Sequence, residues 1–154
     1  MNVYSILTDG LKHSKNWPGK EKALELAGEI IQEIGLDRSD LYRRPSEFSG
    51  GQRQHISIAR ALMKNAPILM LDDSVSAVDT ETEKTILKNL RETRRGKTTV
   101  IIAHRISTVE NLDRIMFLKE GRIEAYGTHS ELIATCPEYA RLVELQKLED
   151  KEVA

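Results

Sequence analysis

Two glycines at the start of a helical pattern, and two aspartates after an apolar run, are the residues of this chain best suited to chemistry. Glycine lets the backbone approach a ligand without a Cβ atom in the way. The helix that we predict over 52–63 has free N–H groups and the positive end of its dipole at its start, which favours a phosphate group. The residues that precede and open this helix are Ser49, Gly50, Gly51 and Gln52. The sequence therefore predicts a helix start that faces phosphate.

The acidic pair Asp72 and Asp73 follows the short apolar run Ile68–Leu71, which comes directly after Pro67. Such a run is typical of a buried strand. Ligands of α/β proteins bind outside the carboxyl ends of their strands, so we expect Asp72 to face a ligand. Two ordinary interpretations stay open at this point. Asp72 is compatible with an unremarkable strand end, and Asp73 with a solvated residue or a helix N-cap.

Composition limits the class of protein. The 154 residues are 40% hydrophobic and 31% charged, which suits one soluble globular domain that buries about 70% of its unfolded surface. The net charge of -1 gives no overall field toward nucleic acid. The single cysteine, Cys136, excludes an internal disulfide and fits a reducing compartment. We see neither a signal peptide nor an apolar run of the roughly 18–20 residues that a membrane span needs.

The elements that must position these residues predict an α/β fold. The first part is helical, with an amphipathic helix from Lys20 that stops near Gly35. The second part alternates strands and helices. We predict a helical subdomain over 1–48, followed over 49–154 by part of a sheet core with flanking helices. A family resemblance of the motifs in 49–154 implies that this core is P-loop-NTPase-like. The expected elements of that second part are a strand over 68–72, a helix over 80–93, a strand over 98–103, a hairpin over 114–126 and a final helix from Pro137.

Four motifs of the chain resemble the ATPase domain of ATP-binding cassette (ABC) transporters. The segment Phe48–Gln54 resembles the signature motif, which in that family contacts the γ-phosphate of ATP bound by the opposite protomer. The run Ile68–Asp72 resembles the Walker B strand, whose terminal aspartate holds the Mg²⁺ shell. His104 resembles the switch histidine that meets the γ-phosphate, although alone it is also compatible with a packed, satisfied histidine. The residues Ser76, Ala77, Val78 and Asp79 resemble the D-loop, which joins the two protomers near the nucleotides.

Two positions depart from the family pattern. The group that orients or deprotonates the attacking water is usually glutamate, and this chain has the shorter Asp73. A misplacement of roughly 1 Å costs on the order of 10²-fold in rate, so we expect slow hydrolysis. Aspartate at this position resembles the degenerate site of heterodimeric exporters, which bind ATP but hydrolyse it poorly. His55 stands where arginine is usual.

No Gly-x-x-x-x-Gly-Lys-Ser/Thr phosphate loop, the Walker A motif, occurs in the sequence. The resemblance covers about the last two thirds of a cassette, and it implies ATP and Mg²⁺ only if a partner supplies that loop. The segment 1–54 resembles peptide importers, whereas 72–79 and 98–108 resemble multidrug exporters. A natural truncation, a fragment and a recombination of two cassettes all fit. We favour recombination, because the change falls inside a motif that both branches share.

The sequence supports three hypotheses of different classes. The chain is part of an ABC ATPase that pairs with a second nucleotide-binding domain, as a hetero- or homodimer. Alternatively, it is a binding module without catalysis, whose helical subdomain docks on a membrane permease from the cytoplasmic side. Third, it is a truncated or engineered chain that serves only as a fold. Whether it is an enzyme, what is transported, and whether transport is import or export stay open.

Overall fold

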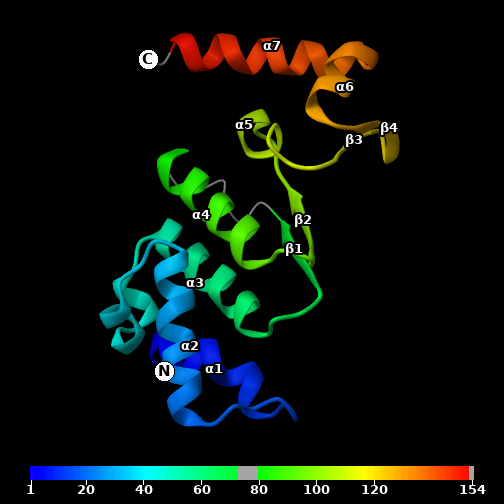
Figure 1. Cartoon of the computed structure of the whole chain (residues 1–154). Helices are drawn as coiled ribbons and strands as arrows, with labels where there is room; N and C mark the ends of the chain where they lie inside the picture. Colours follow the sequence, from blue (N-terminus) through cyan, green and yellow to red (C-terminus); the bar gives the residue numbers. More distant parts are fainter. Residues whose placement is uncertain (73–79, 153–154) are drawn as a thin grey trace. The chain divides into compact units, whose positions relative to one another are not determined.

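The chain forms two compact units, Met1–Ile102 and Ala103–Ala154 (Figure 1). The computed structural model describes residues 1–72 and 80–152. The predicted catalytic residue Asp73 and the predicted D-loop, Ser76 to Asp79, lie outside the described residues.

The first unit opens with a helical segment, as predicted. Gly35, with a φ of 79°, follows the end of the second helix and serves as its stop. Two short 3₁₀ helices then lead to the long helix that carries the glycine pair. The elements are α1 (Val3–Lys12), α2 (Lys20–Glu33), η1 (Arg38–Tyr42), η2 (Pro45–Glu47) and α3 (Gly50–Met63).

The first unit continues as a strand–helix–strand motif. Strand β1 (Ile68–Asp72) and strand β2 (Thr98–Ile102) are parallel and are connected through α4 (Thr80–Thr93). Ile68 lies opposite Thr98, and Asp72 lies opposite Ile102 at the carboxyl end of the pair. Parallel strands need a crossover of this kind, which is why the sequence alternates strand and helix. The predicted α/β class is confirmed.

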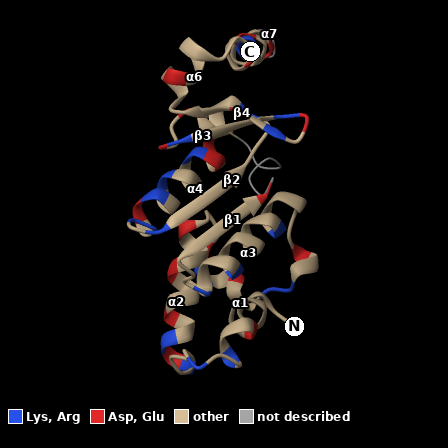
Figure 2. Cartoon of the chain, turned by 90° about the vertical axis from the view of Figure 1, so that its right-hand side faces the viewer, with Lys and Arg blue, Asp and Glu red and all other residues tan. Residues whose placement is uncertain are grey.

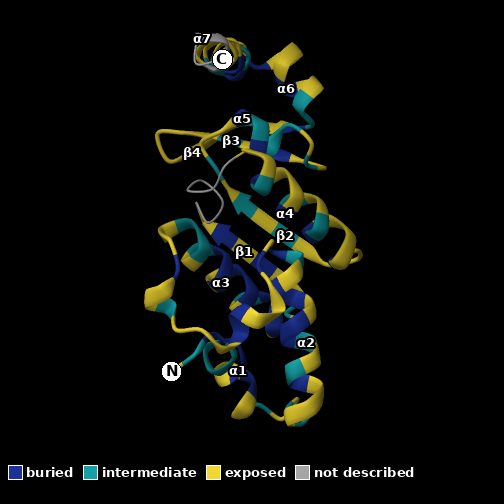
Figure 3. Cartoon of the chain, turned by 90° about the vertical axis from the view of Figure 1, so that its left-hand side faces the viewer, coloured by how far each residue is buried: buried dark blue, intermediate teal, exposed yellow. Residues whose placement is uncertain are grey.

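One apolar core joins the helical segment to the strands (Figure 3). Leu69 and Leu71 of β1 are buried in it, whereas Ile68 and Met70, which alternate with them, are 60% and 67% exposed. The prediction of a buried strand therefore holds for one face of β1 only. Because 1–48 and the strand share this core, the predicted subdomain boundary at residue 48 stays a prediction. Other fully buried members of the core are Leu7, Ile31, Ile34, Leu41, Ile58, Met63 and Ile86.

Arg94, just after α4, is a buried cation that ties this helix to both strands. Its guanidinium donates to the Thr99 hydroxyl at 3.0 Å and to the carbonyl oxygens of Ala66 at 3.1 Å and Thr98 at 3.2 Å. These acceptors lie where β1 and β2 begin. The planar fork of arginine reaches three acceptors at once, which an ammonium group on a flexible stem does not match.

The second unit is a hairpin backed by helices. Strand β3 (Ile115–Lys119) pairs antiparallel with β4 (Arg122–Gly127). The two-residue turn has positive φ at both positions, 48° at Glu120 and 75° at Gly121, as tight hairpins require. The helices are α5 (Ile106–Val109), α6 (His129–Thr135) and α7 (Pro137–Glu152).

Tyr139 of α7 is the largest side chain in the small core of the second unit. Its ring meets Phe117 edge-on at a centroid distance of 5.6 Å, and its hydroxyl bonds to His129 Nδ1 at 2.8 Å. Burial, and to a lesser degree the Glu110 carboxylate, raise the pKa of Tyr139, which keeps the hydroxyl neutral. The other buried members are Ile106, Ile115, Leu132, Cys136 and Val143.

Charged side chains gather on the helices, and β1 and β2 carry few of them (Figure 2). This contrast follows from the packing, since a strand over a core needs apolar residues on at least one face. Within the part of the chain that the structure describes, none of the helices combines the length and the apolar character of a membrane span.

We predict that Arg94→Lys lowers the free energy of unfolding of the first unit by about 1–3 kcal/mol, because lysine leaves part of the buried acceptor set without a donor. The measurement is a urea titration followed by the fluorescence of Trp17, which packs against the core of that unit. The matched control is Arg95→Lys, since Arg95 is exposed. Equal stability of the two variants would show that the three hydrogen bonds of Arg94 contribute nothing.

Candidate functional site

The glycine pair opens α3, and a reciprocal pair of hydrogen bonds fixes this helix start. Ser49 is the N-cap: its hydroxyl accepts from the Gln52 N–H at 3.2 Å, and the Gln52 side-chain oxygen accepts from the Ser49 N–H at 3.0 Å. This is a capping box. We predicted a helix from Gln52, with the glycines in the preceding loop. The helix instead begins at Gly50, because the capping box sets its start at Ser49.

The first turn of α3 carries backbone N–H groups that have no acceptor within the helix. The N–H groups of Gly50 and Gly51 point out of the first turn, where α-helix geometry offers them no acceptor. The cap uses the N–H of Gln52 and leaves these two aside. A Cβ atom built on Gly50 would meet nothing within 4 Å among the described residues. The phosphate-facing role of Ser49 to Gln52 stays a prediction.

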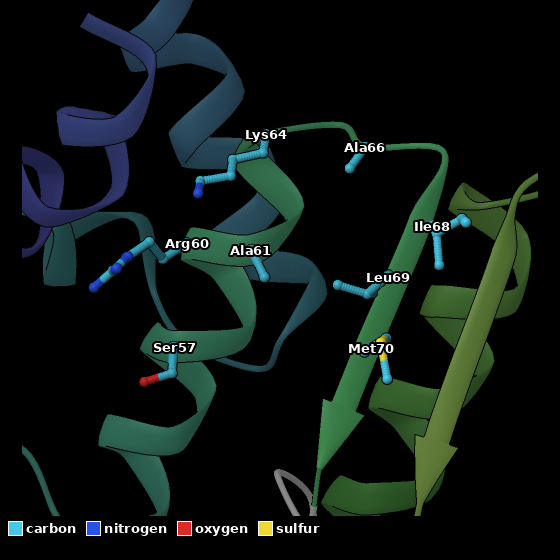
Figure 4. A pocket seen from close by; sticks show the side chains of 8 residues that line it. All are labelled: Ser57, Arg60, Ala61, Lys64, Ala66, Ile68, Leu69 and Met70. Carbon is cyan, nitrogen blue, oxygen red and sulfur yellow. The ribbon is translucent and has the colours of Figure 1, made fainter. Parts of the chain in front are cut away.

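Asp72 lies at the same end of the first unit as this helix start. Helix α3 and strand β1 run in opposite directions, since only residues 64–67 connect them (Figure 4). The helix is about 21 Å long and the strand about 16 Å, so that the start of one lies near the level of the end of the other. Asp72 is exposed, on the same face of β1 as Ile68 and Met70. The structure thus brings Ser49, Gly50, Gly51, Gln52 and Asp72 to one end of the unit.

A hollow of about 500 Å³ lies farther along the same helix and strand, away from these residues. In Figure 4, Ala61 of α3 and Leu69 of β1 point toward one another, whereas Arg60 and Lys64 point away from the strand. It contains neither the capping box nor Asp72, so we do not assign the predicted phosphate-facing site to it. The lining residues are Ser57, Arg60, Ala61, Lys64, Ala66, Ile68, Leu69 and Met70.

His104 belongs to the second unit and follows β2 by two residues. Its side chain is exposed, and its backbone carbonyl accepts a hydrogen bond from Gln146 Nε2 at 2.7 Å. The predicted switch histidine is therefore accessible on a segment whose backbone is held from α7. The spacing of the motifs does not predict a role for Gln146, since its contact with His104 spans 42 residues of the sequence.

The described residues include no group of three or more His, Cys, Asp or Glu side chains that would form a metal site. A single carboxylate at a strand end nevertheless fits Mg²⁺ on a nucleotide, because this ion keeps several waters and takes only one or two carboxylates besides the phosphates. Asp72 is the described residue with that position. Asp73 and the predicted D-loop lie outside the described residues, so their predicted roles stay predictions.

Comparison with known proteins identifies the family. Residues 5–76 match the family model described as "ABC transporter". An ATP-dependent lipid A-core flippase from Methylobacillus flagellatus is 48% identical over 122 residues, which are 78% of this chain. The chain belongs to the ABC transporter ATP-binding cassette family. A flippase of the same name from Aromatoleum aromaticum is 52% identical over 139 residues, or 83% of this chain.

The chain spans about a fifth of the length of these two relatives, 21% and 23% respectively. Solved cassettes have the same fold. A bacterial Atm1-family ABC exporter with ATP bound superposes with a TM-score of 0.76 at 30% identity, over 94% of this chain and 26% of the exporter chain. The dimeric bacterial cassette MJ0796 gives 0.75 at 27% identity, over 84% of this chain and 57% of that cassette.

We predict that Ser49→Ala lowers the free energy of unfolding by about 0.5–2 kcal/mol, since it removes the acceptor for the Gln52 N–H. Urea titration followed by Trp17 fluorescence measures the change. The matched control is Ser57→Ala, in the middle of α3, where the hydroxyl bonds only to the Arg53 carbonyl of the preceding turn. Alanine is the better helix former there, so this control is neutral or slightly stabilising. A loss no larger at position 49 than at position 57 contradicts the capping role.

Proposed function

We propose that this chain supplies the signature motif, the Walker B strand, the D-loop and the switch histidine of an ABC transporter ATPase, which couples ATP hydrolysis to transport. One observation carries the proposal: the Ser49-capped start of α3 and the carboxylate of Asp72 lie at one end of the first unit, in a chain about half identical to two ATP-dependent flippases. Phosphate and its metal ion need these two kinds of group on one surface.

Each of these residues has a separate role at the nucleotide. The N–H groups of Gly50 and Gly51 bind the γ-phosphate of ATP that a second nucleotide-binding domain holds, while Ser49 and Gln52 keep the helix start in shape. Asp72 holds the water shell of Mg²⁺, an ion that neutralises phosphate charge. His104 donates to the γ-phosphate as charge builds up there.

Asp73 orients the attacking water in this proposal, and it does so poorly. Its side chain is one methylene shorter than the usual glutamate, so that the carboxylate stops short of the water. The chain then acts mainly as the ATP-binding, slowly hydrolysing half of an asymmetric pair. The four residues Ser76, Ala77, Val78 and Asp79 join it to the partner domain near the nucleotides.

The transport direction that we propose is export, because the two relatives are flippases and one similar structure is an exporter. The helical subdomain, 1–48, docks on the cytoplasmic side of a membrane permease. The chain thereby stays peripheral to the membrane.

Calorimetric titration tests the composite site. The printed sequence contains no Walker A motif, so we expect the 154-residue chain alone to bind Mg-ATP only weakly, in the millimolar range. With an intact cassette such as MJ0796 present, we expect ATP-dependent association that Gly51→Trp abolishes and that Lys88→Trp, at an exposed position of α4, does not. Micromolar binding by the isolated chain, or association without ATP, contradicts the proposal.

We also predict that Asp73→Glu raises the ATPase rate of the mixed assembly by about 10–100-fold, because the added methylene brings the carboxylate to the water. Steady-state phosphate release at saturating ATP measures this. Asp73→Asn is the control for charge, and it should stay at the low starting rate. If Asp73→Glu leaves the rate unchanged while ATP-dependent association persists, the chain is a binding module without catalysis.

A further inference from the structure

One side chain of α7 bonds to the backbone on both sides of Arg105. The Gln146 side-chain oxygen accepts from the Ile106 N–H at 2.7 Å, and its nitrogen donates to the His104 carbonyl at 2.7 Å. The two partners are 40 and 42 residues away in the sequence. A primary amide carries an acceptor oxygen and a donor nitrogen side by side. Here the two atoms bond to the backbone segment as the peptide groups of a neighbouring strand would.

Packing places Gln146 at this point. Tyr139 and Val143 of α7 are buried against Ile106, which opens α5, and Gln146 follows Val143 on the same face of the helix by three residues. Residues three and four apart share a helix face, so the apolar contacts of Tyr139 and Val143 bring Gln146 to the start of α5. The buried face of α7 thus ends in the Gln146 amide, which lies beside the His104 carbonyl and the Ile106 N–H.

The start of α5 has few other ways to satisfy its backbone. Arg105 is its N-cap residue and makes no side-chain cap hydrogen bond, and α5 is only four residues long. The N–H of Ile106, the first helical residue, has no acceptor within the helix. Gln146 therefore acts as a cap supplied from α7. It also holds the carbonyl of His104, so both backbone bonds fix the segment that carries the histidine.

We propose that Gln146 is a positioning residue for His104: its side-chain amide fixes the backbone on both sides of Arg105 and so sets where the imidazole points. This inference rests on the proposed function, because it assigns Gln146 to the same phosphate-facing histidine. Through this contact the position of α7 affects the rate of hydrolysis, since a shift of α7 would move the backbone of His104.

The test uses variants of the 154-residue chain mixed with an intact cassette such as MJ0796. Gln146→Leu removes both hydrogen bonds at similar volume, and Gln146→Glu keeps the acceptor for Ile106 but loses the donor to His104. Lys147→Leu is the matched control, because Lys147 is the exposed neighbour on α7. We expect Gln146→Leu to lower kcat about tenfold or more with KM for ATP within about twofold, Gln146→Glu to fall between, and Lys147→Leu to match the parent.

A double variant separates positioning from a general structural role. If Gln146 acts through His104, then Gln146→Leu costs nothing further once His104→Ala is present. An equal loss in the presence and absence of His104 overturns the inference. If His104→Ala has the same ATPase rate as the parent chain, the proposed function is contradicted instead. The two failures are thus distinguishable.

A spectroscopic measurement tests the two hydrogen bonds of Gln146 directly, without an ATPase assay. In ¹H–¹⁵N spectra of the 154-residue chain, we expect Gln146→Leu to shift the Ile106 amide upfield and to speed its hydrogen exchange, with an accompanying change in the His104 imidazole signals. Lys147→Leu should leave these signals in place. If the Ile106 and His104 signals are unchanged in Gln146→Leu, the inference is wrong whatever the ATPase rates show.

Discussion

The packing of α3 against β1 is the constraint on which the first unit depends. Ile58 and Met63 of the helix and Leu69 and Leu71 of the strand are buried in one core, and the connection between the two elements is only residues 64–67. A connection this short forces the chain to reverse, so that the start of the helix and the end of the strand lie at one end of the unit. Apolar burial, rather than any contact between polar groups, therefore brings Ser49 and Asp72 to the same end.

Both units prepare their functional segments through backbone geometry. In the first unit, the capping box of Ser49 and Gln52 fixes the start of α3. In the second, the amide of Gln146 holds the backbone next to His104. In each case an uncharged side chain closes backbone hydrogen bonds, and no ion pair is required. Such contacts are insensitive to salt, which suits surfaces that meet the highly charged phosphates of a nucleotide.

Local patterns in the sequence predicted most of the elements. The strand over 68–72 and the helix over 80–93 have the bounds that we expected, because apolar runs, helical spacing and glycine stops are local signals. The observed start of α3 lies two residues before the predicted one, because glycines lower helix propensity while the capping box at Ser49 begins the helix earlier. Contacts across long stretches of sequence could not be predicted at all. Arg94 reaches Ala66 from 28 residues away, and no periodicity encodes that contact.

In the proposed function, the start of α3 and the end of β1 face a nucleotide that a second domain holds, and paramagnetic relaxation tests this arrangement. Mn²⁺ replaces Mg²⁺ on ATP held by an intact cassette, and amide signals of the isotope-labelled 154-residue chain are followed by NMR. The account predicts that the amides of Gly50, Gly51 and Asp72 broaden together, while those of Lys64 and Ile68, at the opposite ends of the same helix and strand, stay sharp. Broadening at Lys64 and Ile68 with sharp signals at Gly50 and Asp72 would contradict it.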